Sequence, residues 1–356
     1  MSRALYSLID RLAVERHLAA EEYQALLDGY TPQLAAYAAE RAVAVRKQVY
    51  GNTVYIRGLI EVSNICKNDC LYCGIRRSNA ACDRYRLSAE DILACCDEGY
   101  ALGFRTFVLQ GGEDGYFTDE RLCALLRQIK TAHPDCAVTL SLGERSYESY
   151  AALREAGADR YLLRHETATK SHYEQLHPAS MSFETRMQCL RDLKALGYAV
   201  GCGFMVGSPH QTTAHLAADL KFIEEFVPQM CGIGPFIPQK DTPLGGYPAG
   251  TLEMTCYLLS LLRLMHPHLL LPSTTALGTI HPNGREMGIL AGANVVMPNL
   301  SPSSVRKKYA LYDNKATDGS ESAQCKAALA ERMAAIGYEV VTARGDARED
   351  ARGVAP

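Results

Sequence analysis

The chain has 356 residues, of which 47% are hydrophobic and 22% charged, and its formal net charge is −3. This composition allows a large buried core and gives no overall basic signal for binding nucleic acid or a membrane surface. Its 13 cysteines, an odd number, do not form the disulfide framework of a secreted protein. We therefore expect a cytoplasmic globular protein with neither a signal peptide nor a membrane-spanning segment.

Residues 1–50 have the pattern of amphipathic helices that precede the main fold. After them the chain repeats one unit, in which a short apolar run is followed by a Gly or polar loop and then by an amphipathic stretch. Eight such units predict an α/β fold, a (β/α)8 TIM-type barrel over residues 51–310, with a C-terminal extension over 311–356 that holds one helix at 322–337. The eight runs are 54–62, 105–110, 137–142, 159–164, 199–206, 231–237, 269–275 and 293–298.

The segment CKNDCLYC places Cys66, Cys70 and Cys73 directly after the first predicted strand. One loop with this CxxxCxxC spacing can direct three thiolates at one iron–sulfur cluster, and a barrel gathers its functional groups at this end of its strands. A zinc knuckle is the less favoured alternative, because the chain has no second CxxC or HxxxH. Three thiolates leave one iron of a [4Fe–4S] cluster without a protein ligand, and an open metal position usually serves chemistry.

The cysteine spacing, with Tyr72 before the third cysteine, resembles the radical S-adenosylmethionine (radical SAM) family. Several further segments resemble the HydE family of [FeFe]-hydrogenase maturases within it: FVLQGGEDGYF, VTLSLGE, ADRYLLRHETA, FETRMQCL, GFMVGSPHQT, GIGPFIPQKDTPL, STTALGTIHPNGRE and GANVVMPNLSPS. The resemblance implies that SAM binds the open iron and is cleaved to methionine and a 5′-deoxyadenosyl radical. It also implies a role in assembling the di-iron centre of the hydrogenase.

The resemblance also assigns the cofactors and partners. It implies one [4Fe–4S] cluster, because the C-terminal region offers only Cys325 for an accessory cluster. The implied substrate is a small organometallic or cysteine-derived molecule. The implied partners are a reductant such as ferredoxin or flavodoxin and other hydrogenase maturases.

The residues expected to bind SAM follow the predicted strands. Glycines in QGGED let the backbone approach a charged amino acid group, although an ordinary βα turn has the same composition. Arg186 offers a two-bond fork to a carboxylate. The resemblance assigns the GGE triplet to the methionine amino group and Glu166 to the ribose or amino acid end of SAM. The full expected set is Tyr72, Gln110, Gly111, Gly112, Glu113, Glu166 and Arg186.

The residues expected to hold the substrate are polar side chains on otherwise apolar strands. Alternation places Thr139 and Ser141 on one face of the third run, and hydroxyl side chains there are either cavity lining or ordinary strand filler. By resemblance Arg164 faces the substrate cavity. We expect Arg164, Thr139, Thr274, Thr275 and Tyr309 to form this catalytic set.

Three alternatives remain open. Two are radical SAM enzymes: an amino acid mutase of the methylornithine synthase type and a sulfur-inserting enzyme of the biotin synthase type. The latter needs a second cluster deep in the barrel, for which Cys136, Cys202 and Cys231 lie on or beside strands. The third is a non-catalytic carrier that binds a cluster and passes it on, although a carrier needs no SAM pocket.

Overall fold

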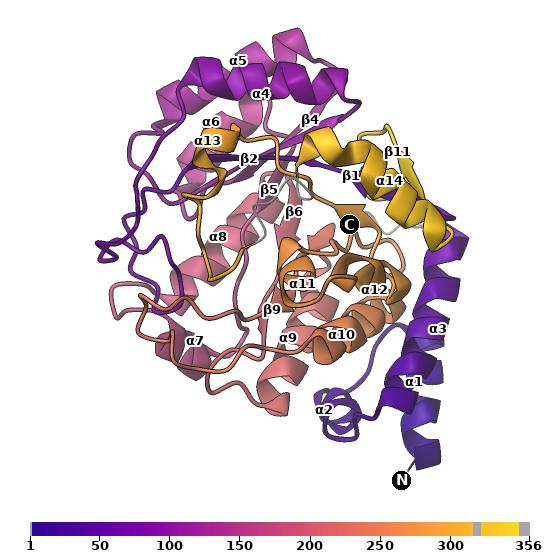
Figure 1. Ribbon diagram of the computed structural model, residues 1–356. Helices are drawn as coiled ribbons and strands as arrows, with labels where there is room; N and C mark the ends of the chain where they lie inside the picture. Colours follow the sequence, from indigo (N-terminus) through magenta and orange to yellow (C-terminus); the bar gives the residue numbers. More distant parts are fainter. Residues whose placement is uncertain (1, 316–321, 349–356) are drawn as a thin grey trace.

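The computed structural model describes residues 2–315 and 322–348. Three helices precede the barrel: α1 (Ser2–Glu15), α2 (Ala20–Asp28) and α3 (Pro32–Tyr50). The hydroxyl of Thr31 accepts a hydrogen bond from the backbone of Leu34, and Pro32 occupies the first turn of α3, where its missing N–H costs nothing. Helices α1 and α3 pack against α10 (Leu252–Met265), and α2 packs against α9 (Thr213–Phe226) (Figure 1).

The strands of the described chain are parallel and form a closed ring. The consecutive strands β1 and β2 together form the first position of the ring. From β2 the order of neighbours is β3, β4, β5, β6 and β8. Leu270 then bridges β8, Pro272 bridges β10, and β10 pairs with β1, which closes the ring. The barrel predicted from the sequence is thus confirmed. The strand bounds are β1 Thr53–Ile56, β2 Gly58–Ser63, β3 Thr106–Gly111, β4 Ala137–Ser141, β5 Arg160–Leu162, β6 Ala199–Cys202, β8 Met230–Cys231 and β10 Val295–Val296.

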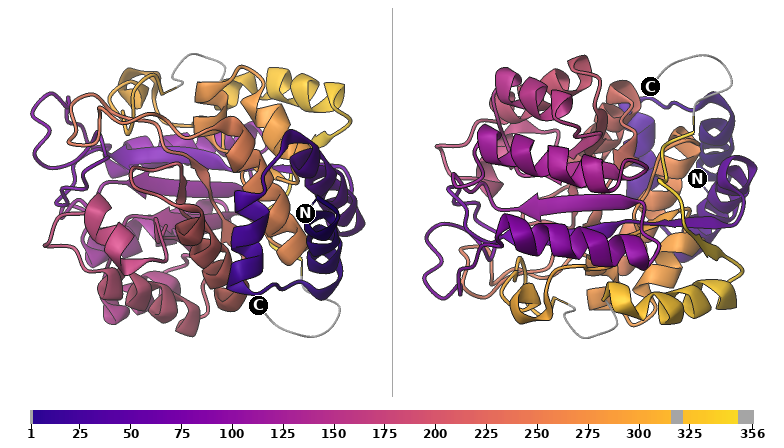
Figure 2. Two further views of the ribbon diagram at one scale, coloured as in Figure 1. Left: turned by 90° about the horizontal axis from the view of Figure 1, so that it is seen from below. Right: turned by 90° about the horizontal axis from the view of Figure 1, so that it is seen from above.

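Helices surround the strands, as the two views in Figure 2 show. Each of the long barrel helices begins after a serine or threonine whose hydroxyl accepts a hydrogen bond from the third residue of the helix. These helices are α4 (Ala89–Ala101), α5 (Asp119–Ala132), α6 (Tyr147–Glu155), α8 (Phe183–Ala195), α9 and α10. The remaining elements of the barrel region are α7 (Lys170–Leu176), α11 (Thr275–Ile280), α12 (Gly284–Leu290), α13 (Ser303–Arg306), β7 (Met205–Val206) and β9 (Gly234–Pro235).

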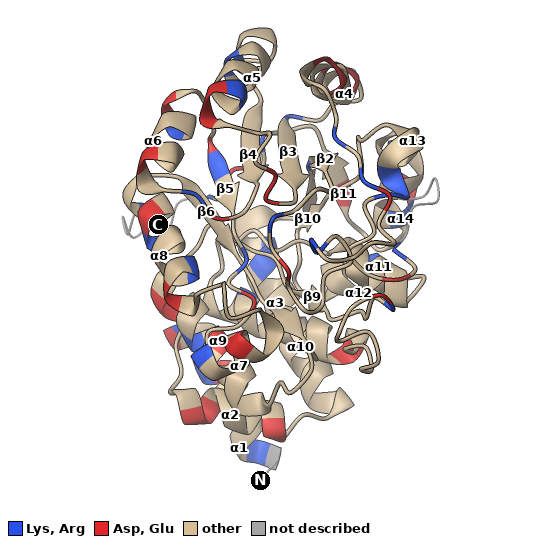
Figure 3. Ribbon diagram, turned by 90° about the vertical axis from the view of Figure 1, so that its left-hand side faces the viewer, with Lys and Arg blue, Asp and Glu red and all other residues tan. Residues whose placement is uncertain are grey.

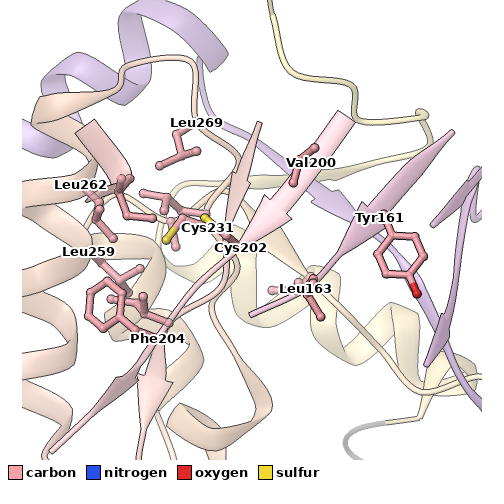
Figure 4. Close-up of a cluster of buried hydrophobic side chains, with 14 of the residues drawn as sticks. Tyr161, Leu163, Val200, Cys202, Phe204, Cys231, Leu259, Leu262 and Leu269 are labelled. Carbon is pink, nitrogen blue, oxygen red and sulfur yellow. The ribbon is translucent and has the colours of Figure 1, made fainter. Parts of the chain in front are cut away.

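The main hydrophobic core lies between the strands and the surrounding helices. Cys202 and Cys231 are neighbours in register on β6 and β8, and both are fully buried. Figure 4 shows their sulfur atoms among the leucines of α10, including Leu259 and Leu262. In this position a thiol acts as a small apolar side chain. Both cysteines therefore belong to the core outside the ring of strands.

The C-terminal extension closes the end of the barrel where the strands begin. A short 3-10 helix (Ala323–Cys325) and α14 (Lys326–Ala335) lead into β11 (Glu339–Val341), which pairs with β1. The sequence predicted the helix but not this strand. Residues 342–348, the C-terminal strap, follow β11. The strap accepts hydrogen bonds from Thr106 at Arg344 O (2.7 Å) and from Arg57 at Gly345 O (3.3 Å).

A cavity of about 320 Å³ lies between the strap and the barrel interior, and its lining includes Arg57, Arg160 and Asp346. Nη2 of Arg160 donates to Oδ1 of Asp346 at 2.5 Å. Burial alone would raise the pKa of Asp346, but Arg344 and Arg160 lower it to about 2. None of the helices in the described ranges has the length and hydropathy needed to span a bilayer.

Candidate active site

The cysteine loop follows β2 at the end of the barrel where the strands finish. Its backbone is held on three sides: Lys67 N–H donates to Glu113 O (3.0 Å), Leu71 N–H to Leu176 O (3.0 Å) and Gly74 N–H to Leu311 O (2.8 Å). These contacts join the loop to the end of β3, to α7 and to the segment after α13. The fold thus holds the backbone of the loop at three points.

The three thiols themselves are partly buried. Sγ of Cys66 accepts a hydrogen bond from Glu113 N–H at 3.4 Å, and Sγ of Cys70 lies 3.7 Å from Sδ of Met181. Burial raises the pKa of Cys66 and Cys70, and it raises the pKa of Cys73 to about 12. The thiols are close enough to raise one another's pKa as well. In the protein alone they are therefore neutral, and binding a metal cluster must release their protons.

The donor set fits an iron–sulfur cluster. In the described part of the chain no three His, Cys, Asp or Glu side chains converge closely enough to hold a single metal ion. A cubane cluster spreads its cysteine ligands more widely than one ion does, and three soft thiolates on one loop are its ordinary donors.

The end of β3 lies directly against the cysteine loop. A Cβ on Gly112 would lie 2.3 Å from Ile65 O and 2.8 Å from Cys66 Cβ, so only glycine allows this approach. Glu113 follows it and packs over Gly143, where a Cβ would lie 2.0 Å from Glu113 Cγ. Oε1 of Glu113 accepts from Glu144 N–H (3.1 Å). The sequence-predicted GGE triplet is thus beside the cysteines.

A crevice of about 330 Å³ opens at the same rim, and Lys67, Glu113, Glu144 and Arg145 are among its lining residues. Oε2 of Glu113 lies 3.1 Å from Nζ of Lys67. The crevice is therefore lined by charges of both signs, which pair with one another as Lys67–Glu113 and Arg145–Asp119.

Arg164 and Glu166 lie together at the end of the fourth barrel strand. Nη2 of Arg164 is 3.2 Å from Oε2 of Glu166. Apart from this ion pair, Nε and Nη2 of Arg164 and Oε2 of Glu166 are buried atoms with no hydrogen-bond partner among the described residues. Glu166 has a positive φ of 66°, a conformation that is uncommon outside glycine. Strain at such a position often accompanies a functional role.

The backbone around Glu166 is held from the neighbouring strand. Glu166 N–H donates to Gly203 O at 3.0 Å, and Met205 N–H donates to Glu166 O at 3.3 Å. Gly203 itself approaches Gly232 so closely that a Cβ there would lie 2.0 Å from Gly232 O. The positive φ of Glu166 is therefore fixed by interstrand hydrogen bonds.

Arg186 on α8 is buried beside the same segment. Its Nε donates to Oε1 of Glu144 at 2.6 Å, and its Nη1 donates to the carbonyl of Arg164 at 2.7 Å. The sequence reasoning assigned Arg186 to the carboxylate of SAM, whereas in the structure Glu144 and Arg164 engage two of its nitrogens. Glu144 was missed. The signal was available, because SLGE repeats after the third strand the Gly–Glu ending of QGGE.

A second buried contact holds the residues after Glu166. Nε2 of His165 lies 3.3 Å from Oδ1 of Asp219, and both side chains are fully buried. The same oxygen accepts a 2.5 Å hydrogen bond from Ala168 N–H. Burial raises the pKa of Asp219 and lowers that of His165 to about 3, so both groups are uncharged. Asp219 lies on α9, far from any motif in the sequence, and was not predicted.

Tyr72 is fixed by a histidine. Its hydroxyl lies 3.3 Å from Nε2 of His177, and Nδ1 of His177 lies 2.9 Å from Tyr173 O. Burial lowers the pKa of His177 to about 3, so the ring is neutral: it donates to the Tyr173 carbonyl and accepts from Tyr72. Tyr72 thus forms a rigid aromatic wall beside the cysteines.

Gln110 and Tyr309 meet inside the barrel mouth, with Nε2 of Gln110 3.4 Å from the Tyr309 hydroxyl. Behind them Glu61 is fully buried, paired with Lys315 and bonded to Nδ2 of Asn299 at 3.0 Å. Nζ of Lys315 lies 4.7 Å from the centre of the Tyr309 ring. Glu61 was also missed, although an acid within the apolar run 54–62 was a visible signal.

The threonines are not all together. Oγ1 of Thr274 is buried without a hydrogen-bond partner among the residues described, and Thr275 begins α11, where its carbonyl accepts from Thr279. Thr139 is in register with Arg160, four residues before Arg164, and it lines the cavity beneath the C-terminal strap. The expected placement of Thr139 beside Arg164 is therefore not found. Alternation gives the face of a strand but not the depth of a residue in a staggered barrel.

Comparisons with known proteins identify the family of the chain. The Radical SAM superfamily profile matches residues 60–223. The [FeFe] hydrogenase maturase subunit HydE of Thermotoga maritima is 46% identical over 76% of this chain and 77% of its own length. The 3-methylornithine synthase of Methanosarcina acetivorans is 30% identical over 76% of each chain. The crystal structure of methylornithine synthase (PylB) matches with a TM-score of 0.83 and 26% identity, covering 94% of this chain and 97% of that one. The chain is therefore an enzyme of the radical SAM superfamily, in the branch that contains HydE.

Proposed function

We propose that this chain is a HydE-type enzyme that cleaves SAM reductively in the assembly of the [FeFe]-hydrogenase di-iron site. The observation that carries the proposal is the pairing, at one barrel mouth, of a three-cysteine loop with the Arg164–Glu166 pair. The identity of 46% to a HydE maturase supports the same reading.

The residues that would hold the cofactors divide into two groups. Cys66, Cys70 and Cys73 would hold one [4Fe–4S] cluster. SAM would lie beside Gly111, Gly112 and Glu113, with Tyr72, Gln110, Glu166 and Arg186 around it. When bound, the two supply a 5′-deoxyadenosyl radical. The chain itself orients SAM and shields the mouth from water.

The position of Arg164 supports the proposal that the substrate is small and anionic. Its Nε lacks a hydrogen-bond partner among the described residues, its Nη2 is paired only with the Glu166 carboxylate, and a guanidinium binds a carboxylate through two parallel hydrogen bonds. Thr274, Thr275 and Tyr309 complete the proposed substrate set. Such a substrate is consistent with a cysteine-derived organometallic molecule. Ferredoxin or flavodoxin would supply electrons, and other maturases would use the product.

A methylornithine synthase-like mutase is the second candidate, because PylB matches the fold with a TM-score of 0.83. The biotin synthase-like alternative ranks third. Cys202 and Cys231 face the leucines of α10, outside the ring of strands, so they do not supply the ligands of a second cluster inside it (Figure 4). The carrier alternative gives no role to the Arg164–Glu166 pair.

The deciding experiment uses protein reconstituted with iron and sulfide under anaerobic conditions. SAM and dithionite should give 5′-deoxyadenosine, and addition to a cell-free maturation mixture lacking HydE should restore hydrogenase activity. Conversion of lysine to methylornithine without maturation would favour the mutase. Absence of SAM cleavage in cluster-loaded protein would favour the carrier.

A further inference from the structure

Charge is distributed unevenly around the cysteine loop. Segments 66–86 and 303–308 together contain eight basic and two acidic residues, a formal charge of +6 in a chain whose net charge is −3. We call these two segments the basic ridge. Its basic members are Lys67, Arg76, Arg77, Arg84, Arg86, Arg306, Lys307 and Lys308. The rest of the chain is thus net acidic.

The two segments of the ridge are far apart in the sequence but touch in the structure. Nδ2 of Asn64, just before the cysteine loop, donates to Lys308 O at 2.8 Å, and Nζ of Lys308 lies 2.9 Å from Asp83. A Cβ on Gly74 would lie 2.0 Å from Ala310 O, so the backbones are in direct contact. Figure 3 shows the basic segment of α13 on the side of the molecule that carries these loops.

Part of the excess charge faces solvent, since Lys67 and Arg86 are paired with Glu113 and Asp114 outside the ridge. The ridge acids are neutralised, since Asp69 pairs with Arg76 (2.9 Å) and Asp83 with Lys308. Arg77 and Lys307 are exposed, and neither has an ion-pair partner among the residues that the structure describes. Because these two cations are not compensated locally, they generate a field that extends about 8–10 Å into solvent at physiological salt.

The ridge is also the covering of the proposed cluster. Arg77 N–H donates to Asn68 O at 2.8 Å, within the cysteine loop itself, and Lys67 is adjacent to Cys66. The described chain holds the other side of the cluster loop against β3 and α7. A reductant that approaches from solvent must therefore come to this face, since electron transfer between proteins requires close approach.

We propose that the basic ridge is the docking surface for a small acidic one-electron carrier protein. The inference rests on the proposed function and adds the location and charge of the partner. One electron leaves the reduced flavin or iron–sulfur centre of the carrier and enters the cluster, and no bond is made or broken. Complementary charge raises the association rate, and that rate falls as salt is added.

The test compares two reductants on reconstituted enzyme. The Arg77→Glu/Lys307→Glu variant reverses both uncompensated charges. With limiting reduced flavodoxin at low ionic strength, its initial rate of 5′-deoxyadenosine formation should fall about tenfold or more, as expected for lost electrostatic steering. With dithionite the rate should equal that of wild type. The matched control, Lys47→Glu/Arg127→Glu, makes the same charge change on α3 and α5 and should leave both rates unchanged.

The outcomes separate the two proposals. Failure of wild type to cleave SAM with dithionite would contradict the proposed function itself. Cleavage with dithionite together with an unchanged flavodoxin-driven rate in the ridge variant would overturn the docking surface alone. An equal loss with both reductants would also overturn it, because the residues would then act on the cluster and not on docking. Iron content of each variant confirms that the compared proteins carry the same cluster.

Discussion

Asp219 reaches from α9 to the backbone of Ala168, where its Oδ1 accepts a hydrogen bond of 2.5 Å. Together with Arg186, which holds the carbonyl of Arg164, it fixes both ends of the segment that contains Glu166. We predict that Asp219→Leu weakens SAM binding about tenfold, because one buried hydrogen bond to this backbone is lost. Asp219→Asn keeps an acceptor oxygen and should bind normally. Calorimetric titration of cluster-loaded protein checks both, and equal affinities for Leu and Asn would contradict the role.

Replacement of a cluster cysteine should remove the cluster. We expect wild type to bind about four irons per chain and Cys66→Ala, Cys70→Ala or Cys73→Ala to lose both iron and SAM cleavage, since two thiolates do not hold a cubane. Cys325→Ala is the control and should retain both. Iron analysis with absorbance spectroscopy decides. About eight irons in wild type would reveal a second cluster.

Gly112 should be required for the cluster loop to adopt its conformation. A methyl group there would lie 2.3 Å from the carbonyl of Ile65, and a backbone atom cannot move aside cheaply. We therefore predict that Gly112→Ala lowers iron occupancy at least severalfold. Gly115→Ala is the matched control and should keep its iron, because nothing lies within 4 Å of the Cβ position of Gly115. Iron per chain after identical reconstitution is the measurement, and full occupancy in Gly112→Ala would refute the packing argument.

Arg164→Lys separates substrate binding from cofactor binding. Lysine keeps the charge but cannot form the two-bond fork. We predict that the variant binds SAM and shows slow uncoupled cleavage, but loses at least tenfold of its activity in hydrogenase maturation. Loss of SAM affinity instead would place Arg164 in the cofactor site.

Stability should fall on mild acidification. Burial lowers the pKa of His172 to about 4 and that of His177 to about 3, so the folded protein keeps both neutral while the unfolded chain protonates them below about pH 6.5. Through these two groups the unfolded state then binds two more protons. Their contribution to stability is therefore full above pH 6.5 and is lost as the pH falls, with a slope approaching about 2.7 kcal/mol per pH unit. The opposite shifts of His165 and Asp219 cancel in this range.

Thermal or urea unfolding between pH 7 and 4.5 measures this slope. In His172→Gln the difference in bound protons between the unfolded and folded states should fall by about one, because one of the two buried imidazoles is gone. A slope unchanged from wild type would show that His172 is protonated in the folded state.

The barrel and the cysteine loop at its mouth could be predicted from the sequence, because both depend on local patterns. Strand runs and helix caps repeat at fixed intervals, and the spacing of Cys66, Cys70 and Cys73 is a local motif. The depth of Thr139 in the barrel could not be predicted from a local pattern, because it depends on the stagger between strands. The role of Asp219 could not be predicted either, because its partner Ala168 lies 51 residues away in the sequence.

The strand β11 has a consequence for synthesis of the chain. The strand β1 pairs only with late partners in the described structure: Tyr55 with Val295 of β10, and Val54 with Val340 of β11. Both partner strands leave the ribosome after nearly all of the other barrel strands have been synthesised. Throughout translation β1 therefore keeps two unpaired edges, which are the features of a nascent chain that attract chaperones or pair wrongly. Pairing of β1 must wait for β10 and β11, so the barrel closes only once these strands have been made.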